Sequence, residues 1–332
     1  MPTILSCNAG CVMKKFSINI GAILAVCAAC VFIMAIALSI GASHVTLLSL
    51  ISGTSSVATQ IIMLRLLRVF MAFVVGAALA VSGCIFQALL KNPLAEPYTL
   101  GVSGGAAFGA SIAIITASSA VSVYAFLGGV LTVIIIFFIA RTMQFHPTAI
   151  ILAGISLGFV LSSSVLLIFA FAKPDTIHKT LMWLSGDLSM AQYEHITLYA
   201  TSILVLTAIA LFFHRHLDII SFGTGFATTH GIGTVHIATL FWIASLATSI
   251  TVAATGIIGF VGLIVPHAVR TIKANHAFLL PVSAIAGGTT LVVADTIGRS
   301  IVMPYEIPSG IITGFFGGIF FLILLLTRKD AL

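Results

Sequence analysis

The segment from Arg65 to Gly105 reads RLLRVFMAFVVGAALAVSGCIFQALLKNPLAEPYTLGVSGG. Two arginines precede an uncharged apolar run at residues 69–90, and a polar loop bracketed by Pro93 and Pro97 follows it. An apolar run of about 20 residues is long enough to cross a bilayer as a helix. The arginines and the loop therefore anchor a membrane-spanning helix at both of its ends.

The composition indicates that the whole chain is a membrane protein. Of its 332 residues, 60% are hydrophobic and 7% are charged, whereas about 25% of the residues of a soluble domain are charged. Uncharged stretches of about 20 residues recur along the chain, while an outer-membrane barrel would show alternating segments of about 10 residues. We therefore expect an all-α membrane protein.

Runs bounded by charges, prolines or glycine clusters predict about ten spans. The eighth is short and contains Gly256, Gly259, Gly262 and Pro266, so we expect it to be bent or partial. We interpret residues 13–332 as a single transmembrane domain and residues 1–12 as a disordered tail or a start-site artefact. The predicted spans are 16–39, 62–90, 100–117, 121–141, 149–172, 193–213, 235–255, 257–272, 277–299 and 307–327.

The cations predict an orientation, because short cytoplasmic loops are enriched in lysine and arginine. With ten crossings and both termini in the cytoplasm, nine of the fourteen cations lie inside. The other five cations lie outside, against the usual enrichment of cations in cytoplasmic loops. A partner protein that docks on the outer face is a candidate reason for these outside cations. The inside set is Lys14, Lys15, Lys91, Arg141, Arg215, Arg270, Lys273, Arg328 and Lys329; the outside set is Arg65, Arg68, Lys173, Lys179 and Arg299.

Motifs for catalysis and for metal or cofactor binding are missing from the sequence. No Gly-x-x-x-x-Gly-Lys-Ser/Thr loop is present, so we do not expect this chain to bind or hydrolyse ATP, or to be an enzyme. The ten histidines form no His-Glu-x-x-His pattern. All five cysteines lie in the first 84 residues, and we interpret them as packing residues, with Cys27 and Cys30 as a weak metal or redox signal.

The acids give little support to ion coupling. Only Asp295 lies clearly within a predicted span, and Arg299 follows it at the helical spacing that allows a local ion pair. We favour this structural pair over a proton relay. A transporter built on this chain then needs an energy source from another chain; the alternative is an ion-coupled secondary transporter that acts alone.

Three ordered motifs resemble the FecCD family of ABC-transporter permeases over nearly the whole chain from about Lys14 onward. The first is the segment quoted above, although Leu67 stands where the family commonly has proline. The second is Gly256-Ile-Ile-Gly-Phe-Val-Gly-Leu-Ile-Val-Pro-His267 with Arg270, and the third joins Asp295–Arg299 to Glu306-Ile-Pro-x-Gly310. Near the end, Gly317-Gly318-Ile319-Phe320 replaces a frequent Gly-x-Pro-x-Phe pattern.

The resemblance implies a type II ABC importer permease with ten transmembrane helices in the cytoplasmic (inner) membrane. The implied partners are a second copy of the chain, two ATPase subunits, an extracytoplasmic substrate-binding protein and membrane lipid, with no nucleic acid. The implied cargo is a metal chelate, namely a ferric siderophore, haem or cobalamin. No cofactor is implied.

The resemblance also implies four functional regions. Docking of the binding protein falls on Arg65, Arg68 and Arg299. The cytoplasmic gate falls on Asn92, Pro93, Leu94, Glu96, Pro147 and Thr148. Coupling to the ATPase falls on residues 217–233, as two short helices with Asp218, Gly223, Gly225, Ala227 and Gly233. The dimer interface falls on Gly154, Gly158, Gly310 and Gly314, with Ser162, Ser163 and Ser164 near the pathway.

Overall fold

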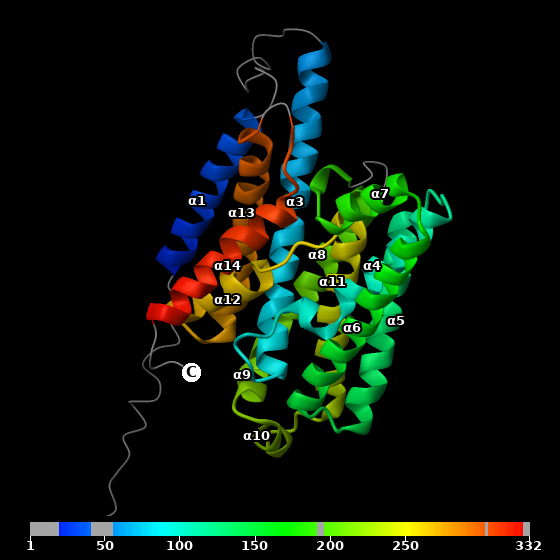
Figure 1. Cartoon of the computed structure of the whole chain (residues 1–332). Helices are drawn as coiled ribbons and strands as arrows, with labels where there is room; N and C mark the ends of the chain where they lie inside the picture. Colours follow the sequence, from blue (N-terminus) through cyan, green and yellow to red (C-terminus); the bar gives the residue numbers. More distant parts are fainter. Residues whose placement is uncertain (1–19, 41–55, 191–195, 303–304, 328–332) are drawn as a thin grey trace, which may run out of the picture.

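A computed structural model describes residues 20–40, 56–190, 196–302 and 305–327, and within these ranges the chain forms helices and no strand (Figure 1). The predicted tail at residues 1–12 lies outside the described residues. The all-α class predicted from the composition is confirmed.

Each of the ten predicted spans contains one long helix. Five of these helices are long and apolar enough to cross a membrane. Helix α8 reaches the length of a sixth span only when it is counted together with α9 (His214–Ser221), which follows it across a bend of 59°. The other four helices have shorter apolar stretches. Ten crossings are therefore compatible with the fold and remain a prediction. The ten helices are α1 (Ile20–Ser39), α3 (Ser56–Leu89), α4 (Val102–Ile115), α5 (Val121–Thr142), α6 (Pro147–Phe171), α8 (Ile196–Phe212), α11 (Thr234–Thr255), α12 (Val261–Ile272), α13 (His276–Ser300) and α14 (Ser309–Thr327).

The central element is α3, which runs the length of the bundle (Figure 1). In this view α1, α12, α13 and α14 lie on one side of α3, and the remaining long helices lie on the other. A methyl group at Gly76 of α3 would overlap the carbonyl oxygen of Gly287 in α13. Glycine thus lets the two backbones touch, and this close contact replaces the hydrophobic burial that holds helices together in water.

Short helices cap both ends of the bundle (Figure 1). At one end, here called the α7 end, lies the amphipathic helix α7 (Pro174–Leu184), which falls between two predicted spans, 149–172 and 193–213. At the other, here called the α10 end, lie α9 and α10 (Thr224–Thr229). Two short helices were predicted within residues 217–233, and α9 and α10 occupy that segment. Two 3₁₀ turns complete the described elements: η1 (Pro97–Leu100) and η2 (Leu188–Met190).

The eighth predicted span is interrupted, as its glycines indicated. Helix α12 begins only at Val261, because Gly256 and Phe260 adopt positive φ angles of 73° and 67°. Glycine takes such a conformation readily, whereas a phenylalanine there is strained and needs its surroundings to hold it. The non-helical residues 256–260 leave backbone groups that must find partners within the protein.

Candidate functional site

The three motifs of the sequence meet along α3. Gly83 lies so close to Gly262, in the second motif, that a methyl group would overlap its carbonyl oxygen. Gln87 donates from Nε2 to the carbonyl oxygens of Gly262 and Leu263, at 3.4 Å each. Near the start of the same helix, Arg68 reaches the third motif. Segments 175 to 227 residues apart in the sequence are thus held together by one helix.

A cluster of five charged residues, here called the arginine cluster, lies toward the α7 end. Arg68 Nη2 lies 2.9 Å from Asp295 Oδ1 and 3.6 Å from Asp187 Oδ1, and Arg68 Nη1 lies 2.7 Å from Glu306 Oε2. Arg299 Nε lies 2.9 Å from Asp295 Oδ2, so the predicted local pair is confirmed. Asp295 therefore stands between two guanidinium groups, which stabilise its charge away from water.

The sequence did not reveal the other members of this cluster. Asp187 and Glu306 lie in connections between helices, where neither has a helical spacing to Arg68 that a pattern could detect. Only the predicted pair of Asp295 with Arg299 had such a signal.

The three arginines predicted to dock a binding protein are largely buried inside the chain. The exposed fractions are 7% for Arg65 and 4% for Arg299, and the side chain of Arg68 is 10% exposed. Arg65 donates from Nη1 to the carbonyl oxygen of Leu38 at 3.2 Å. The guanidinium groups thus have partners within the chain. In the arginine cluster, the side chain of Glu306 is 36% exposed and is more accessible than those of the other four members. Docking at these arginines stays a prediction.

The predicted gate segment folds into a tight, internally bonded turn. Asn92 Oδ1 accepts a hydrogen bond from Leu94 N at 2.9 Å, and Pro93 lies between them. Glu96 accepts a hydrogen bond from the backbone N–H of Phe260, so this loop holds the strained residue that precedes α12. Burial raises the pKa of the Glu96 carboxyl from its ordinary value of 4.5 to about 7, although the hydrogen bond from Phe260 acts in the opposite direction.

The other predicted gate residues begin α6. Pro147 occupies the first turn of α6, and Thr148 beside it is exposed. About two turns further along, Gly154 packs against the backbone of Thr99 and Leu100 in η1. A hollow of about 290 Å³ separates α6 from η1 and the start of α4, lined by Tyr98, Thr99, Ser103, Gly154, Gly158 and Ser162 among others. The 3₁₀ turn η1, which follows the gate turn, and the α6 glycines therefore border one hollow.

The predicted coupling residues differ in accessibility. Gly225 and Gly233 have open space around them, and Gly223 adopts a φ angle of 132° that favours glycine. Ala227 is fully buried in the chain's own core, so its side chain presents no surface to a partner. Asp218 of α9 accepts hydrogen bonds from the backbone N of His276 at 2.9 Å and pairs with its Nδ1 at 2.7 Å. Asp218 thus ties α9 to the start of α13.

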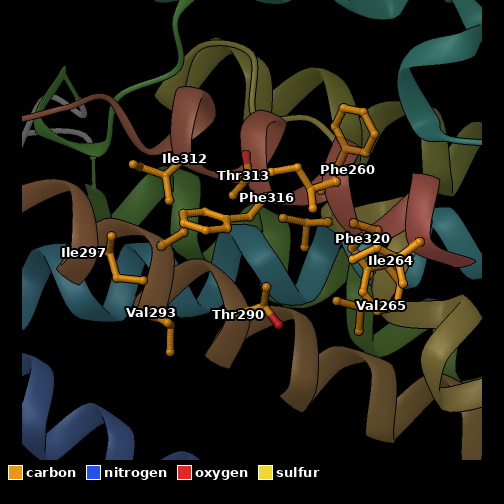
Figure 2. A pocket seen from close by; sticks show the side chains of 15 residues that line it. Phe260, Ile264, Val265, Thr290, Val293, Ile297, Ile312, Thr313, Phe316 and Phe320 are labelled. Atoms are coloured by element: carbon orange, nitrogen blue, oxygen red, sulfur yellow. The ribbon is translucent and has the colours of Figure 1, made fainter.

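The α14 glycines fall into two groups. Gly310 packs against the carbonyl oxygens of Ser185 and Ile257 within the chain, whereas Gly314 has open space around it. Beside Gly314, a groove of about 430 Å³ runs between α12, α13 and α14. Figure 2 shows side chains such as Phe316, Ile297 and Val293 around this groove, whose lining is apolar apart from Thr290 and Thr313.

The described part of the chain contains no candidate metal site and no disulfide bond. No group of three or more metal-ligating side chains occurs there, and Cys27, Cys30 and Cys84 are free thiols. Cys7 and Cys11 lie outside the described residues.

The fold and the meeting of the three motifs define a class, the polytopic permease subunits of ABC transporters. A solved structure of an inward-facing ABC transporter assigned to the metal-chelate type superposes with a TM-score of 0.81 and 28% identity, over 92% of this chain and 98% of that one. The structure of PsaBC from Streptococcus pneumoniae, at 22% identity and a TM-score of 0.55, shares the fold over 79% of this chain and 90% of that one.

Within that class, the chain belongs to the FecCD transport family, whose model matches residues 22–327. It is 36% identical to the Fe(3+) dicitrate permease protein FecD of Escherichia coli, over 80% of this chain and 84% of that protein. It is 34% identical to the hemin permease protein HmuU of Yersinia pestis, over 80% and 83% respectively. It is 36% identical to the cobalamin permease protein BtuC of Halobacterium salinarum, over 80% and 73%.

Proposed function

We propose that this chain is the membrane-spanning subunit of an ATP-driven importer for a metal chelate. It would receive the chelate from a binding protein at the α7 end and pass it toward the α10 end, where separate ATPase subunits supply the energy. The observation that supports this most strongly is the match to a metal-chelate type transporter along 98% of that chain's length. Relatives named for iron citrate, hemin and cobalamin support the class of cargo.

We propose that the permease works as a pair of copies, which meet through α6 and α14. Both helices present large apolar side chains on their outer faces, such as Phe159 at 71% exposed and Phe315 at 63%. Gly314, which has open space around it, would let a second backbone approach closely. The hollow beside Gly158 would then border the substrate path between the copies.

We propose that α9 and α10 contact the ATPase, with Gly225 on the contact surface. Closure of the ATPases would move α9, and the Asp218–His276 contact would transmit this movement to α13. The gate turn with Glu96 would respond because it holds the residue that starts α12. In the same proposed assembly, the binding protein would dock near Arg65, Arg68 and Arg299, and its acidic residues would meet a surface bordered by the arginine cluster.

The test is to purify the chain with its ATPase subunits and its binding protein, and to measure ATP hydrolysis in lipid vesicles. Loaded binding protein should stimulate the rate. Gly225→Glu should abolish the stimulation, because a charge buried at the contact without a partner is costly. The permease should stay folded, because no atom lies within 4 Å of a Cβ added at Gly225. Thr142→Glu, at an exposed position on α5, is the matched control. Stimulation that survives Gly225→Glu would contradict the proposed contact.

A further inference from the structure

A pocket of about 660 Å³, with several charged and polar side chains in its lining, opens at the α10 end, between the end of α3, helix α9 and the connection from α12 to α13. We call it the α9 pocket. No role was predicted for it from the sequence, although it borders both the gate turn and the coupling helices. Its chemistry is set by Gln87, Lys91, Asp218, Phe222, Arg270 and His276.

The charges that line the α9 pocket are not balanced. Lys91 and Arg270 both line it, and no described carboxylate forms an ion pair with either of them. Asp218 is the acid in the lining, and its Oδ1 is already engaged by the backbone and the ring of His276. Arg270 is half-buried, and a charge withdrawn from water without a counter-ion is unfavourable. The pocket is therefore suited to an anion.

A buried amide adds a second requirement to the ligand. Gln87 is 2% exposed, and its Nε2 is used by the carbonyl oxygens of Gly262 and Leu263. Its Oε1 is buried and has no hydrogen-bond partner among the described residues. A carbonyl oxygen in this position accepts hydrogen bonds only. The ligand that satisfies the pocket thus combines an anionic group for the two cations with a hydroxyl donor for Gln87.

The surroundings of the pocket favour a membrane lipid as the source. Phe222 lines the pocket and is 79% exposed, and Ile272, at the end of α12, is 72% exposed. Exposed apolar side chains next to a cationic opening are suited to the boundary between headgroups and acyl chains, and basic pockets between spanning helices bind anionic headgroups. We propose that the α9 pocket binds the headgroup of an anionic phospholipid, with Lys91 and Arg270 on the phosphate and Gln87 accepting from a headgroup hydroxyl, as in phosphatidylglycerol.

The test measures binding of phosphatidylglycerol and of phosphatidylcholine to the purified full-length chain by native mass spectrometry in a neutral detergent. The intact chain should retain phosphatidylglycerol more strongly. The double variant Lys91→Gln/Arg270→Gln should lower its affinity by about tenfold or more, since two charged contacts are lost. Arg141→Gln/Arg215→Gln removes two exposed cations at the same end and is the matched control. Arg270→Lys should keep most of the affinity, which separates loss of charge from loss of folding.

Three outcomes would overturn the proposal. Equal weakening by the test and control pairs would show a diffuse effect of charge instead of a site. Equal retention of the two lipids would remove the anion preference. Displacement of phosphatidylglycerol by millimolar inorganic phosphate, with the same dependence on Lys91 and Arg270, would identify a soluble anion as the occupant.

Discussion

The two ends of α3 use their charges in opposite ways. At the α7 end, Arg68 and Arg299 meet Asp187, Asp295 and Glu306 within ion-pair distance. At the α10 end, Lys91 and Arg270 face a pocket whose acid is engaged by His276. In a chain with so few charges, a matched cluster joins distant segments of the fold, whereas an unmatched group is available to a ligand. The comparison predicts that the same kind of substitution will have very different effects at the two ends.

The largest effect is expected at the arginine cluster. Asp295→Asn leaves Arg299, which is buried, and Arg68, whose side chain is 10% exposed, facing a neutral amide. Removal of one partner from a buried ion pair costs about 3–5 kcal/mol, so the unfolding free energy in detergent should fall by that order. Asp187→Asn is the control within the cluster, and its effect should be smaller because the nearest approach to Arg68 is 3.6 Å. Equal effects of the two substitutions would show that Asp295 is not the centre of the cluster.

The next effect concerns Glu96, which is half-buried and accepts a hydrogen bond from the backbone N–H of Phe260. No described cation forms an ion pair with it. Its folded pKa of about 7 lies above the ordinary value of 4.5, so the folded state holds the proton more tightly than the unfolded chain. Its contribution to stability is therefore present below pH 4.5, is lost as the pH rises to about 7, and changes no further above that. The loss is on the order of 3 kcal/mol at most.

Glu96→Gln should remove this part of the pH dependence. The measurement is thermal unfolding of both proteins across pH 4.5 to 8, with the difference between them plotted against pH. A difference that does not vary with pH would contradict the raised pKa of Glu96.

A small effect is expected in the α9 pocket. Arg270→Gln removes a half-buried cation that has no described acidic partner, so in a detergent without anionic lipid the unfolding free energy should change by less than about 1 kcal/mol, with either sign. Addition of phosphatidylglycerol should then raise the melting temperature of the unmodified chain more than that of the variant. If Arg270→Gln lowered the unfolding free energy in detergent as much as Asp295→Asn does, Arg270 would have a counter-charge within the chain itself.

The smallest effect is expected at the exposed pair on α7. Lys179 Nζ lies 2.7 Å from Asp175 Oδ2, but both side chains are mostly in solvent, at 64% and 73% exposed. The lysine lowers the pKa of the Asp175 carboxyl, yet exposed pairs of this kind add little to stability. Lys179→Ala should leave the melting temperature unchanged within error. A clear shift in the melting temperature would contradict this expectation. It would show that a short distance between the charges is enough to stabilise the fold, even when the pair is exposed to solvent.

The sequence predicted what depends on local patterns. Apolar length located the ten long helices, the glycines near Gly256 indicated the broken span, and the spacing of Asp295 and Arg299 predicted their pair. It could not place α7, because an amphipathic helix of 11 residues that begins with Pro174 resembles a loop in a hydropathy reading. It also missed the contact of Arg68 with Asp295, since no local rule connects residues 227 positions apart.

Accessibility was the other quantity that the sequence could not supply. Ala227 and Gly225 stand in the same run of small residues, yet only the second is open to a partner. Likewise, Gly310 packs inside the chain and Gly314 does not, although they share one helical stripe. The difference depends on which neighbouring segments fold over each position, and that information is tertiary.

The most direct test of the central proposal is transport by the reconstituted permease. Vesicles containing the chain with its ATPase subunits, supplied with binding protein loaded with a metal chelate, should take up the chelate when ATP is present on the ATPase side. Vesicles containing the chain alone should take up none under a proton or sodium gradient. Gradient-driven uptake by the chain alone would contradict the account and establish the ion-coupled alternative.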